Sequence, residues 1–560
     1  MTLAVEPRTT EDGSIPLIDV ATLAGLLADG GESALVDVRE EGVQARDGQI
    51  LLSVPLPLSR LELRAGLLLP RRDVRLVVTD AGDGALAALA ARRLRDLGFT
   101  DVSLLDGGVA AWIASGRETY TGSSAYSKAF GEFVEHAYRT PHLSAVEVKS
   151  RLDAGEDLVV LDGRTLPEFE AFSIPGAHAV PNAELPYRVH DLVRSPATLV
   201  VVNCAGRTRS IIGAQALINA GLPNPVAALE NGTMAWLKAG YALDHGVSRP
   251  APAPSPAGLA EARAAVERLT RRFGLRWLDE AGLAGLEAER PARTLYLYDV
   301  RTRAEFEAGH LPGSHWAEGG QLVQGIDRFA AVRNARLVVI DDENGARAAI
   351  TASWLVQLGW GEVYAYRLPP GRREAGPDWI PPLGAPEGPA EAISPRQAES
   401  LLARGGAVVL DLATSLDYAA GHVPGALFAV RARLAEGLDR LPEGEILVTS
   451  PDGVLAAYAA PELARLTGRP VRRLAGGTQA WRAAGLPVET GETALHHAPD
   501  DVWRSPYHAA GDRQAAFRAY LDWEVNLLAQ IGRDDTVRFR TFPVEHAAPP
   551  AGQGPVGLAP

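Results

Sequence analysis

The chain has a single cysteine, Cys204, among 560 residues. One thiol cannot form an intramolecular disulfide, so the fold requires no oxidising compartment. Positive charge is also scarce, because 55 Lys and Arg stand against 69 Asp and Glu and give a formal net charge of −14. This balance argues against general binding to nucleic acids or anionic membranes, since a phosphate-binding surface needs a cationic footprint.

Long apolar runs are missing as well. No stretch reaches the roughly 18 apolar residues of a membrane-spanning helix. Residues 1–7 show neither the basic nor the apolar region of a secretory signal peptide. We therefore expect a cytoplasmic protein that binds neither nucleic acid nor membrane.

Familiar cofactor motifs are absent too. His496 and His497 have no third potential ligand at a useful spacing, which favours solvated histidines over a metal site. The glycine pairs at 107–108 and 476–477 are not followed by the Lys-Ser/Thr of a phosphate-binding loop. The sequence thus predicts no metal and no cofactor.

What the chain does contain is one plan repeated four times. Its 46% hydrophobic and 22% charged residues are typical of globular domains, and its length suffices for several. In each copy an apolar strand ends in an aspartate, followed two residues later by Arg in the first three copies. A second apolar strand leads, about 40 residues beyond the aspartate, to a loop position. The aspartates are Asp37, Asp162, Asp299 and Asp411, and the loop positions are Asp80, Cys204, Asp341 and Ser450.

The endings of the repeats also correspond. Three copies close with Gly-x-x-x-Trp, whose tryptophans are Trp112, Trp236 and Trp481. The third copy has a proline-rich segment at 368–371 instead, and we expect Trp379 to fill the same space. Strands alternate with helical patterns in each unit, which predicts a parallel sheet flanked by helices. In the second copy we expect strands at 158–161 and 198–203 and a helix at 210–220.

Segments outside the repeat divide the chain. Residues 248–256 are rich in proline and predict an extended, semi-rigid linker that separates the repeats into two pairs. Ser144 and Ser394 open capping boxes at the first helices of the second and fourth units. A C-terminal tail carries an apolar helical stripe interrupted by Glu524. We expect this stripe, like the helix near 127–135, to pack on a neighbouring domain, with a homodimer or partner contact as the alternative.

The predicted order is four α/β units and a helical tail. The segments are 15–118 for the first unit, 119–140 for a bridging helix, 141–246 for the second unit, 247–257 for the linker, 258–380 for a divergent third unit, 390–490 for the fourth and 499–545 for the tail.

Cys204 is expected to be reactive. It follows a β-branched run and precedes a helical pattern, at the start of Cys-Ala-Gly-Arg-Thr-Arg-Ser. A thiol facing a turn whose N–H groups converge at a helix N-terminus has its anion stabilised by those donors and by the helix dipole. Arg207 and Arg209 add positive charge. A small buried packing residue is the alternative for a lone cysteine.

Taken together, these motifs resemble the rhodanese family, and the chain is similar to a tandem, four-domain rhodanese-related sulfurtransferase up to about residue 490. The resemblance rests on Asp162-Gly163-Arg164, the turn at 174–177, the Cys204 loop and the ending at 232–236, in that order. It implies a five-stranded parallel sheet wrapped by helices in each unit. It also implies an enzyme in which Cys204 takes sulfane sulfur from a donor such as thiosulfate as a persulfide and passes it to a thiol or cyanide.

The resemblance further implies roles for the residues around Cys204. Arg209 is expected to draw the donor's sulfonate and close the loop, whereas Arg207 is expected to face solvent as an attractor. Asp162 and Arg164 are expected to brace the loop and the fold. The backbone amides expected to bind the substrate belong to Ala205, Gly206, Arg207, Thr208, Arg209 and Ser210.

The other three loops argue against four active sites. Asp80 and Asp341 cannot form a persulfide and would repel thiosulfate, and Ser450 lacks the polarisable sulfur. We expect scaffold or regulatory units, with substrate or partner binding as the alternative. A cysteine phosphatase or arsenate reductase is disfavoured, because only four residues separate Cys204 from Arg209. A partner-dependent sulfur relay with a protein acceptor remains open.

Overall fold

The computed structural model describes residues 9–10, 15–388, 390–509 and 511–543. The signal-peptide expectation for residues 1–7 and the last two residues of the predicted tail segment lie outside these ranges. Each of the four predicted units forms a five-stranded parallel sheet, and the strand order is the same in all four. In the second unit this order is β6-β10-β9-β7-β8. The prediction of four α/β units with helices on parallel sheets is confirmed.

The units repeat their elements as well as their sheets. The first contains β1 (Leu17–Ile18), α1 (Val20–Ala28), β2 (Ser33–Asp37), α2 (Glu41–Asp47), β3 (Val54–Pro55), α3 (Leu61–Leu68), β4 (Arg75–Thr79), α4 (Ala85–Asp96), β5 (Val102–Leu105) and α5 (Gly108–Ala114). After α6 (Ala125–Tyr138), the second contains β6 (His142–Leu143), α7 (Ala145–Asp153), β7 (Leu158–Asp162), α8 (Leu166–Ala171), β8 (His178–Ala179), α9 (Leu185–Arg188), β9 (Leu199–Asn203), α10 (Thr208–Ala220), β10 (Val226–Leu229) and α11 (Gly232–Lys238).

The second half follows the same scheme. The third unit contains α12 (Pro256–Phe273), β11 (Trp277–Leu278), α13 (Glu280–Ala288), β12 (Leu295–Asp299), α14 (Arg303–Ala308), β13 (His315–Trp316), α15 (Gly319–Gln324), β14 (Arg336–Asp341), α16 (Ala346–Leu358) and β15 (Glu362–Arg367). The fourth contains β16 (Glu391–Ile393), α17 (Pro395–Ala403), β17 (Ala407–Asp411), α18 (Ser415–Ala420), β18 (Leu427–Phe428), β19 (Glu445–Thr449), α19 (Val454–Thr467), β20 (Val471–Leu474) and α20 (Gly477–Ala483). The tail contains η7 (Pro506–His508) and α21 (Arg513–Ile531).

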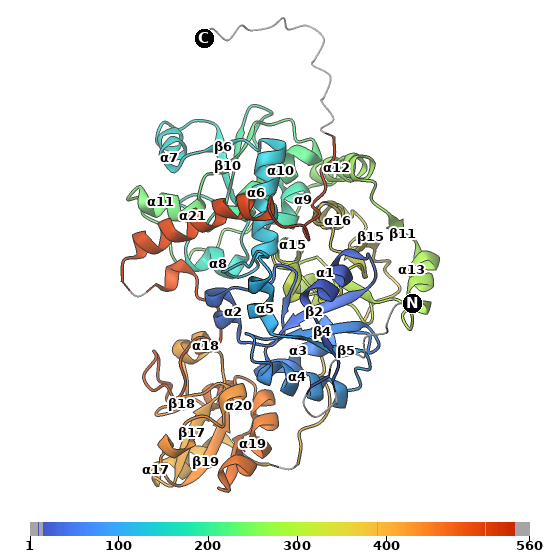
Figure 1. Cartoon of the computed structure of the whole chain (residues 1–560). Coiled ribbons are helices and arrows are strands. Elements are labelled where there is room, and N and C mark those ends of the chain that lie inside the picture. Colours follow the sequence, from blue (N-terminus) through green and yellow to red (C-terminus); the bar gives the residue numbers. More distant parts are fainter. Residues whose placement is uncertain (1–8, 11–14, 389, 510, 544–560) are drawn as a thin grey trace, which may run out of the picture.

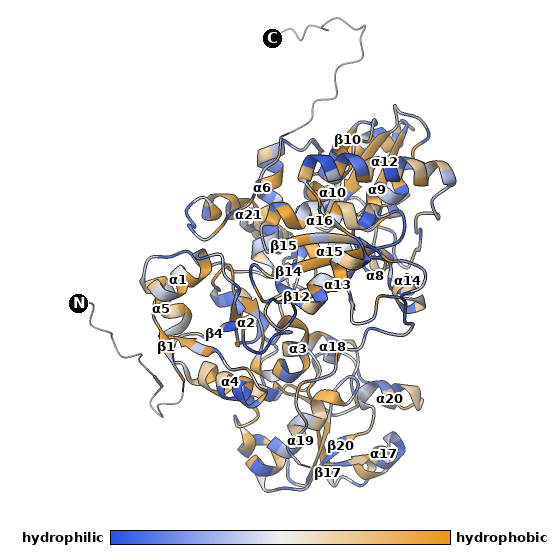
Figure 2. Ribbon diagram, turned by 90° about the vertical axis from the view of Figure 1, so that its right-hand side faces the viewer, coloured by the Kyte–Doolittle hydropathy of each residue, from blue (hydrophilic) through white to orange (hydrophobic). Residues whose placement is uncertain are grey.

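The central strands of each sheet are formed by short apolar runs of the sequence. Parallel strands covered by helices on both faces are buried on both sides, so they lack polar alternation. Val200, Val201 and Val202 of β9 are all fully buried, and so is nearly all of β10, which is largely orange in Figure 2. Both capping boxes predicted from sequence are present, at Ser144 and Ser394.

The Asp-x-Arg motif is a clamp at the end of the second strand of the unit. Arg164 donates to both carboxylate oxygens of Asp162 and to the carbonyl of Phe172, which ties β7 to the turn after α8. Arg39 and Arg301 make the equivalent bonds in the first and third units. Asp162 and Arg164 thus form one of three equivalent buried ion pairs among the described residues.

The Gly-x-x-x-Trp ending brings a helix against the loop. Gly232 has a φ of +52°, and a Cβ there would lie 2.2 Å from the carbonyl oxygen of Cys204. Only glycine allows that approach, after which Trp236 is buried in the core of the unit. In the third unit the expectation for Trp379 is wrong, because this side chain is 65% exposed. An apolar core cluster of this unit contains Tyr366 of β15 and Leu368 directly after it, and no tryptophan among the described residues.

The units group as three plus one rather than as two pairs. One continuous apolar core joins the first three units with α6 and α12, whereas the fourth has cores of its own. The linker is extended as predicted, but it is docked: Ala179 at the end of β8 bonds to Arg249 and Ala251. The helix α12 begins already at Pro256. A proline-rich segment therefore acts here as an added edge of the second sheet.

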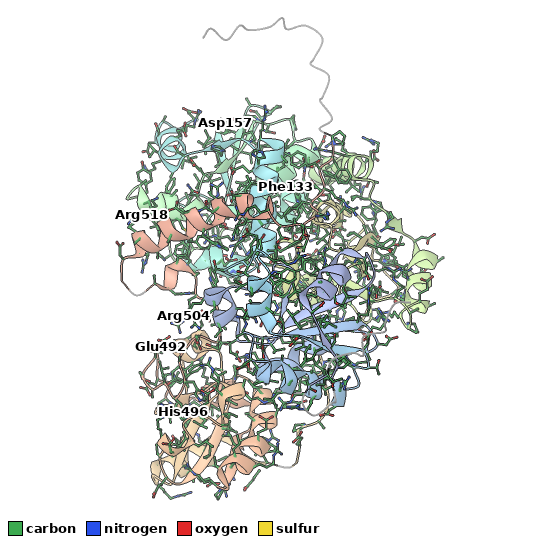
Figure 3. All side chains as sticks on the ribbon, in the orientation of Figure 1. Phe133, Asp157, Glu492, His496, Arg504 and Arg518 are labelled. Atoms are coloured by element: carbon green, nitrogen blue, oxygen red, sulfur yellow. The ribbon has the colours of Figure 1, made fainter. Side chains whose placement is uncertain are left out.

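The tail returns to the second unit. Its helix α21 packs along α6, and Phe517 and Leu521 form a small apolar cluster with Met234 of α11 (Figure 1). An ion pair between Arg504 and Glu492 lies within the segment that connects the fourth unit to the tail (Figure 3). The apolar stripe is therefore covered within the chain, as the packing interpretation expected.

Candidate active site

Cys204 lies at the carboxyl end of β9, directly before the turn that starts α10. The helix begins at Thr208, two residues earlier than predicted, so the turn is short. Cys204 is buried, with 2% of its surface exposed, and its Sγ lies 3.6 Å from Oγ of Ser210. The Cys204 carbonyl accepts the N–H of Thr233 at 2.9 Å, which fixes the floor of the loop against α11.

The electrostatics of the thiol differ from the expectation. Burial raises the pKa of Cys204, while Arg209 and the hydrogen bonds between the thiol and Ser210 lower it by a smaller amount. Glu524 adds a negative charge that raises the pKa further. In the covered site desolvation outweighs Arg209 and Ser210, because a buried anion loses its hydration.

Arg209 is held by a carboxylate. Its two terminal nitrogens donate to the two oxygens of Glu168, each at 2.8 Å, and only 8% of Arg209 is exposed. Glu168 also caps α8 together with Thr165. Burial opposes ionisation of Glu168, yet Arg209 and the Thr165 hydrogen bonds lower its pKa to about 2. Arg209 is thus fixed beside Cys204 in a charge-assisted, two-pronged bond.

The expectation for Arg207 is wrong. Its guanidinium does not face solvent but forms ion pairs with Glu132 and Glu135 of α6, and only 8% of the residue is exposed. It also donates to the Asn231 side chain at the start of α11. Sequence could not show this, because the partner helix lies about 70 residues earlier in the chain.

A cavity of about 330 Å³ lies over Cys204. The loop, Arg164, Glu168 and Phe172 form one side of it. The remaining walls come from segments that the sequence did not connect to the site. These are Lys128 of α6, Gln324 of α15, and Trp503, Tyr507, Tyr520 and Glu524 of the tail.

Tyr507 joins the tail directly to the loop. Its hydroxyl donates to the carbonyl of Ala205 at 3.2 Å and lies 2.6 Å from the hydroxyl of Thr233. Its ring lies against Phe172, at 4.8 Å between ring centres. No motif marked Tyr507 as a site residue, because the sequence alone does not place the tail.

Lys128 and Glu524 add charge to the cavity. The Lys128 ammonium lies over the rings of Trp503, Tyr520 and Trp523, and burial lowers its pKa to about 8. Glu524 is 1% exposed and accepts the Thr208 hydroxyl at 3.1 Å through Oε1. The one sequence signal for Glu524 was its interruption of an apolar stripe.

The equivalent loops of the other units are filled by their own side chains. The Asp80 carboxylate accepts the N–H groups of Gly82, Gly84 and Ala87. Asp341 accepts those of Asp342, Arg347 and Ala348, and the Ser450 hydroxyl accepts that of Ala456. In these three loops, backbone N–H groups that could bind an anionic substrate therefore already donate to the side-chain oxygen of Asp80, Asp341 or Ser450.

The histidine pair also differs from expectation. His497 is buried rather than solvated, and it accepts the N–H of Val430. Burial lowers its pKa to about 4. The described residues contain no group of three or more His, Cys, Asp or Glu side chains placed to hold a metal ion. None of the helices in the described ranges has the length and apolar content of a membrane crossing.

The rhodanese-like domain family matches the chain four times, over residues 19–115, 144–239, 283–368 and 394–484. Each segment begins after the first strand of one sheet and contains its other four strands, and together the segments cover more than half of the chain. The chain therefore belongs to the rhodanese-like family, as the motifs predicted.

Particular relatives define the likeness more closely. The crystal structure of a thiosulfate sulfurtransferase from Pseudomonas aeruginosa is 45% identical, with a TM-score of 0.89, and the match covers 94% of this chain and 100% of that one. A protein of the same organism described as "probable 3-mercaptopyruvate sulfurtransferase" is 31% identical over 28% of this chain and 62% of its own length. An HTH-type transcriptional regulator of Mycobacterium tuberculosis is 38% identical over 20% of this chain and 50% of its own. The chain thus spans between half and two thirds of these two curated relatives.

Proposed function

We propose that the chain is a sulfurtransferase that moves sulfane sulfur from a donor such as thiosulfate to a thiol or cyanide through a persulfide on Cys204. The observation that carries this proposal is the contrast between the four loops. In the second unit the loop presents a sulfur atom and two arginines to an open cavity, whereas in the other units a side-chain oxygen of the loop accepts the loop's own N–H groups. The 45% identical thiosulfate sulfurtransferase supports the same chemistry.

The reaction takes two displacements at one sulfur. The Cys204 thiolate attacks the outer sulfur of thiosulfate, the donor's S–S bond breaks, and sulfite leaves with the bonding electron pair. A thiolate or cyanide then attacks the terminal sulfur of the persulfide, and the Cys204 thiolate is released. Splitting the transfer in this way needs a nucleophile that also leaves well, which a thiolate provides.

The residues around Cys204 divide this work. The backbone N–H groups of the loop from Ala205 to Ser210 bind the anionic sulfur, and Arg209 draws the donor's sulfonate. Asp162 and Arg164 hold the end of β7 and the turn after α8. Arg207 positions α6 through Glu132 and Glu135 instead of attracting the donor from solvent.

The tail favours small reactants over a sulfur relay between proteins. Cys204 is buried, and Tyr507 and Tyr520 of the tail line the cavity that leads to it, so we expect a protein acceptor to require displacement of the tail. We assign scaffold roles to the other three units. A single free thiol that must stay reduced fits the cytoplasm.

Sulfur loading tests the proposal. Wild-type protein incubated with thiosulfate should gain the mass of one sulfur atom, and Cys204→Ser should gain none. Sulfur on the serine variant, or none on the wild type, would refute the assignment. Parallel turnover with cyanide, glutathione and thioredoxin compares small acceptors with a protein one.

A further inference from the structure

The charges around the cavity do not balance for an anionic substrate. Arg164 is paired with Asp162 and Arg209 with Glu168, so neither brings net charge. Arg207 is paired with two carboxylates. Lys128 offsets the single surplus negative charge of these pairs, so an ionised Glu524 would leave the cavity net negative. Such a cavity repels a dianion, and the repulsion is strong where water is excluded.

Glu524 has one oxygen free to change this balance. Its Oε1 accepts the Thr208 hydroxyl, while its buried Oε2 accepts no hydrogen bond of ordinary geometry from the described residues. The nearby Tyr520 hydroxyl on the same helix also interacts with this carboxyl group. Oε2 lies over the loop, 3.2 Å from the position that a Cβ on Gly206 would take. A buried carboxylate oxygen without a donor is costly, whereas a protonated one can donate to a ligand in the cavity.

We propose that Glu524 admits the anionic sulfur donor by taking up one proton when the donor enters the Cys204 cavity, so that its O–H donates to the bound anion. This inference rests on the proposed function and names a specificity-determining residue from the tail. The proton comes from solvent, and no bond of the donor changes in this step. The tail thereby makes the site selective for anions without adding a further cation.

The surroundings of Glu524 support proton uptake. Burial raises its pKa, Glu132 raises it further, and Lys128, Thr208 and Arg207 lower it by less. An anion in the cavity would raise it again, because like charges disfavour ionisation. The charged and titratable groups that face it are Lys128 and Glu132 of α6, Cys204, Arg207 and Arg209 of the loop, and Tyr520 of its own helix.

Thiosulfate binding to Cys204→Ser separates this step from the chemistry of the thiol. The dissociation constant, measured by calorimetry from about pH 5 to about pH 8, should rise about tenfold per pH unit above the pKa of Glu524, as linkage to one proton requires. Glu524→Gln in the same background should remove this slope and retain tight binding. Asp522→Asn, an exposed charge removal on the same helix, should leave the slope unchanged.

Proton uptake gives a second measurement that needs no change at Glu524. Binding enthalpies of Cys204→Ser in buffers of different ionisation enthalpy should report uptake of one proton per thiosulfate at a pH above the pKa of Glu524. A pH-independent dissociation constant, an equal slope in Glu524→Gln, or no thiosulfate binding at any pH would overturn the inference. Sulfur loading of the wild type, measured in parallel, tests the proposed function independently of the role of Glu524.

Discussion

Replacing Arg209 by Gln should raise the pKa of the Cys204 thiol. Arg209 is the strongest influence that lowers this pKa, and the substitution also leaves Glu168 as an unneutralised negative charge at the same wall. An opposite charge at close range shifts a pKa by about 1–3 units, so we expect a rise of that size, equivalent to ~1.4–4 kcal/mol. At a fixed pH below the thiol pKa, the thiolate fraction should fall about 10- to 1000-fold, and kcat/KM for thiosulfate should fall with it.

The single cysteine makes this prediction measurable without ambiguity. Thiolate absorbance can be followed against pH, with Cys204→Ser as the blank, because no other thiol contributes. The double variant Arg209→Gln/Glu168→Gln should show a smaller rise than Arg209→Gln, since the uncompensated carboxylate is gone. An unchanged thiol pKa in Arg209→Gln would refute the view that Arg209 stabilises the anion.

Three further outcomes are expected. Tyr507→Phe removes the hydrogen bond from the tyrosine hydroxyl to the Ala205 carbonyl and should weaken docking of the tail by about 1 kcal/mol. Amide hydrogen exchange in α21 should then be faster, and unchanged exchange would contradict this. Arg347→Met leaves Asp341 buried without its cation and should lower the free energy of unfolding, measured by denaturant titration, by ~3–5 kcal/mol. A loss no larger than that of a surface substitution would contradict this prediction. Glu168 has a lowered pKa, so its stabilisation is complete above its ordinary pKa of 4.5 and is lost as the pH falls toward about 2. Because the Glu168 side chain is 40% exposed, we expect this contribution to be only ~1 kcal/mol, and Glu168→Gln should lack that acid-dependent loss in thermal unfolding scans.

Local patterns predicted the fold well. The apolar runs, capping residues and loop positions recur at nearly equal spacing, and each depends on neighbours within one unit, so the sequence could be read directly. The same holds for the Asp162–Arg164 clamp, whose partners are two residues apart. Two predictions that depended on packing between distant segments were wrong: Trp379 is exposed, and the units group as three plus one instead of as two pairs.

The amino-acid sequence alone shows that Cys204 is the one thiol and that its loop, with Arg209, resembles that of rhodaneses. The tertiary structure decided what surrounds that thiol. Arg207 is neutralised by α6, and the tail, about 300 residues later, supplies Tyr507 and Glu524 to the cavity. The physical reason is that burial and charge pairing arise from contacts between distant segments. Those contacts set the pKa of Cys204 and the charge that a donor meets, and no local pattern encodes them.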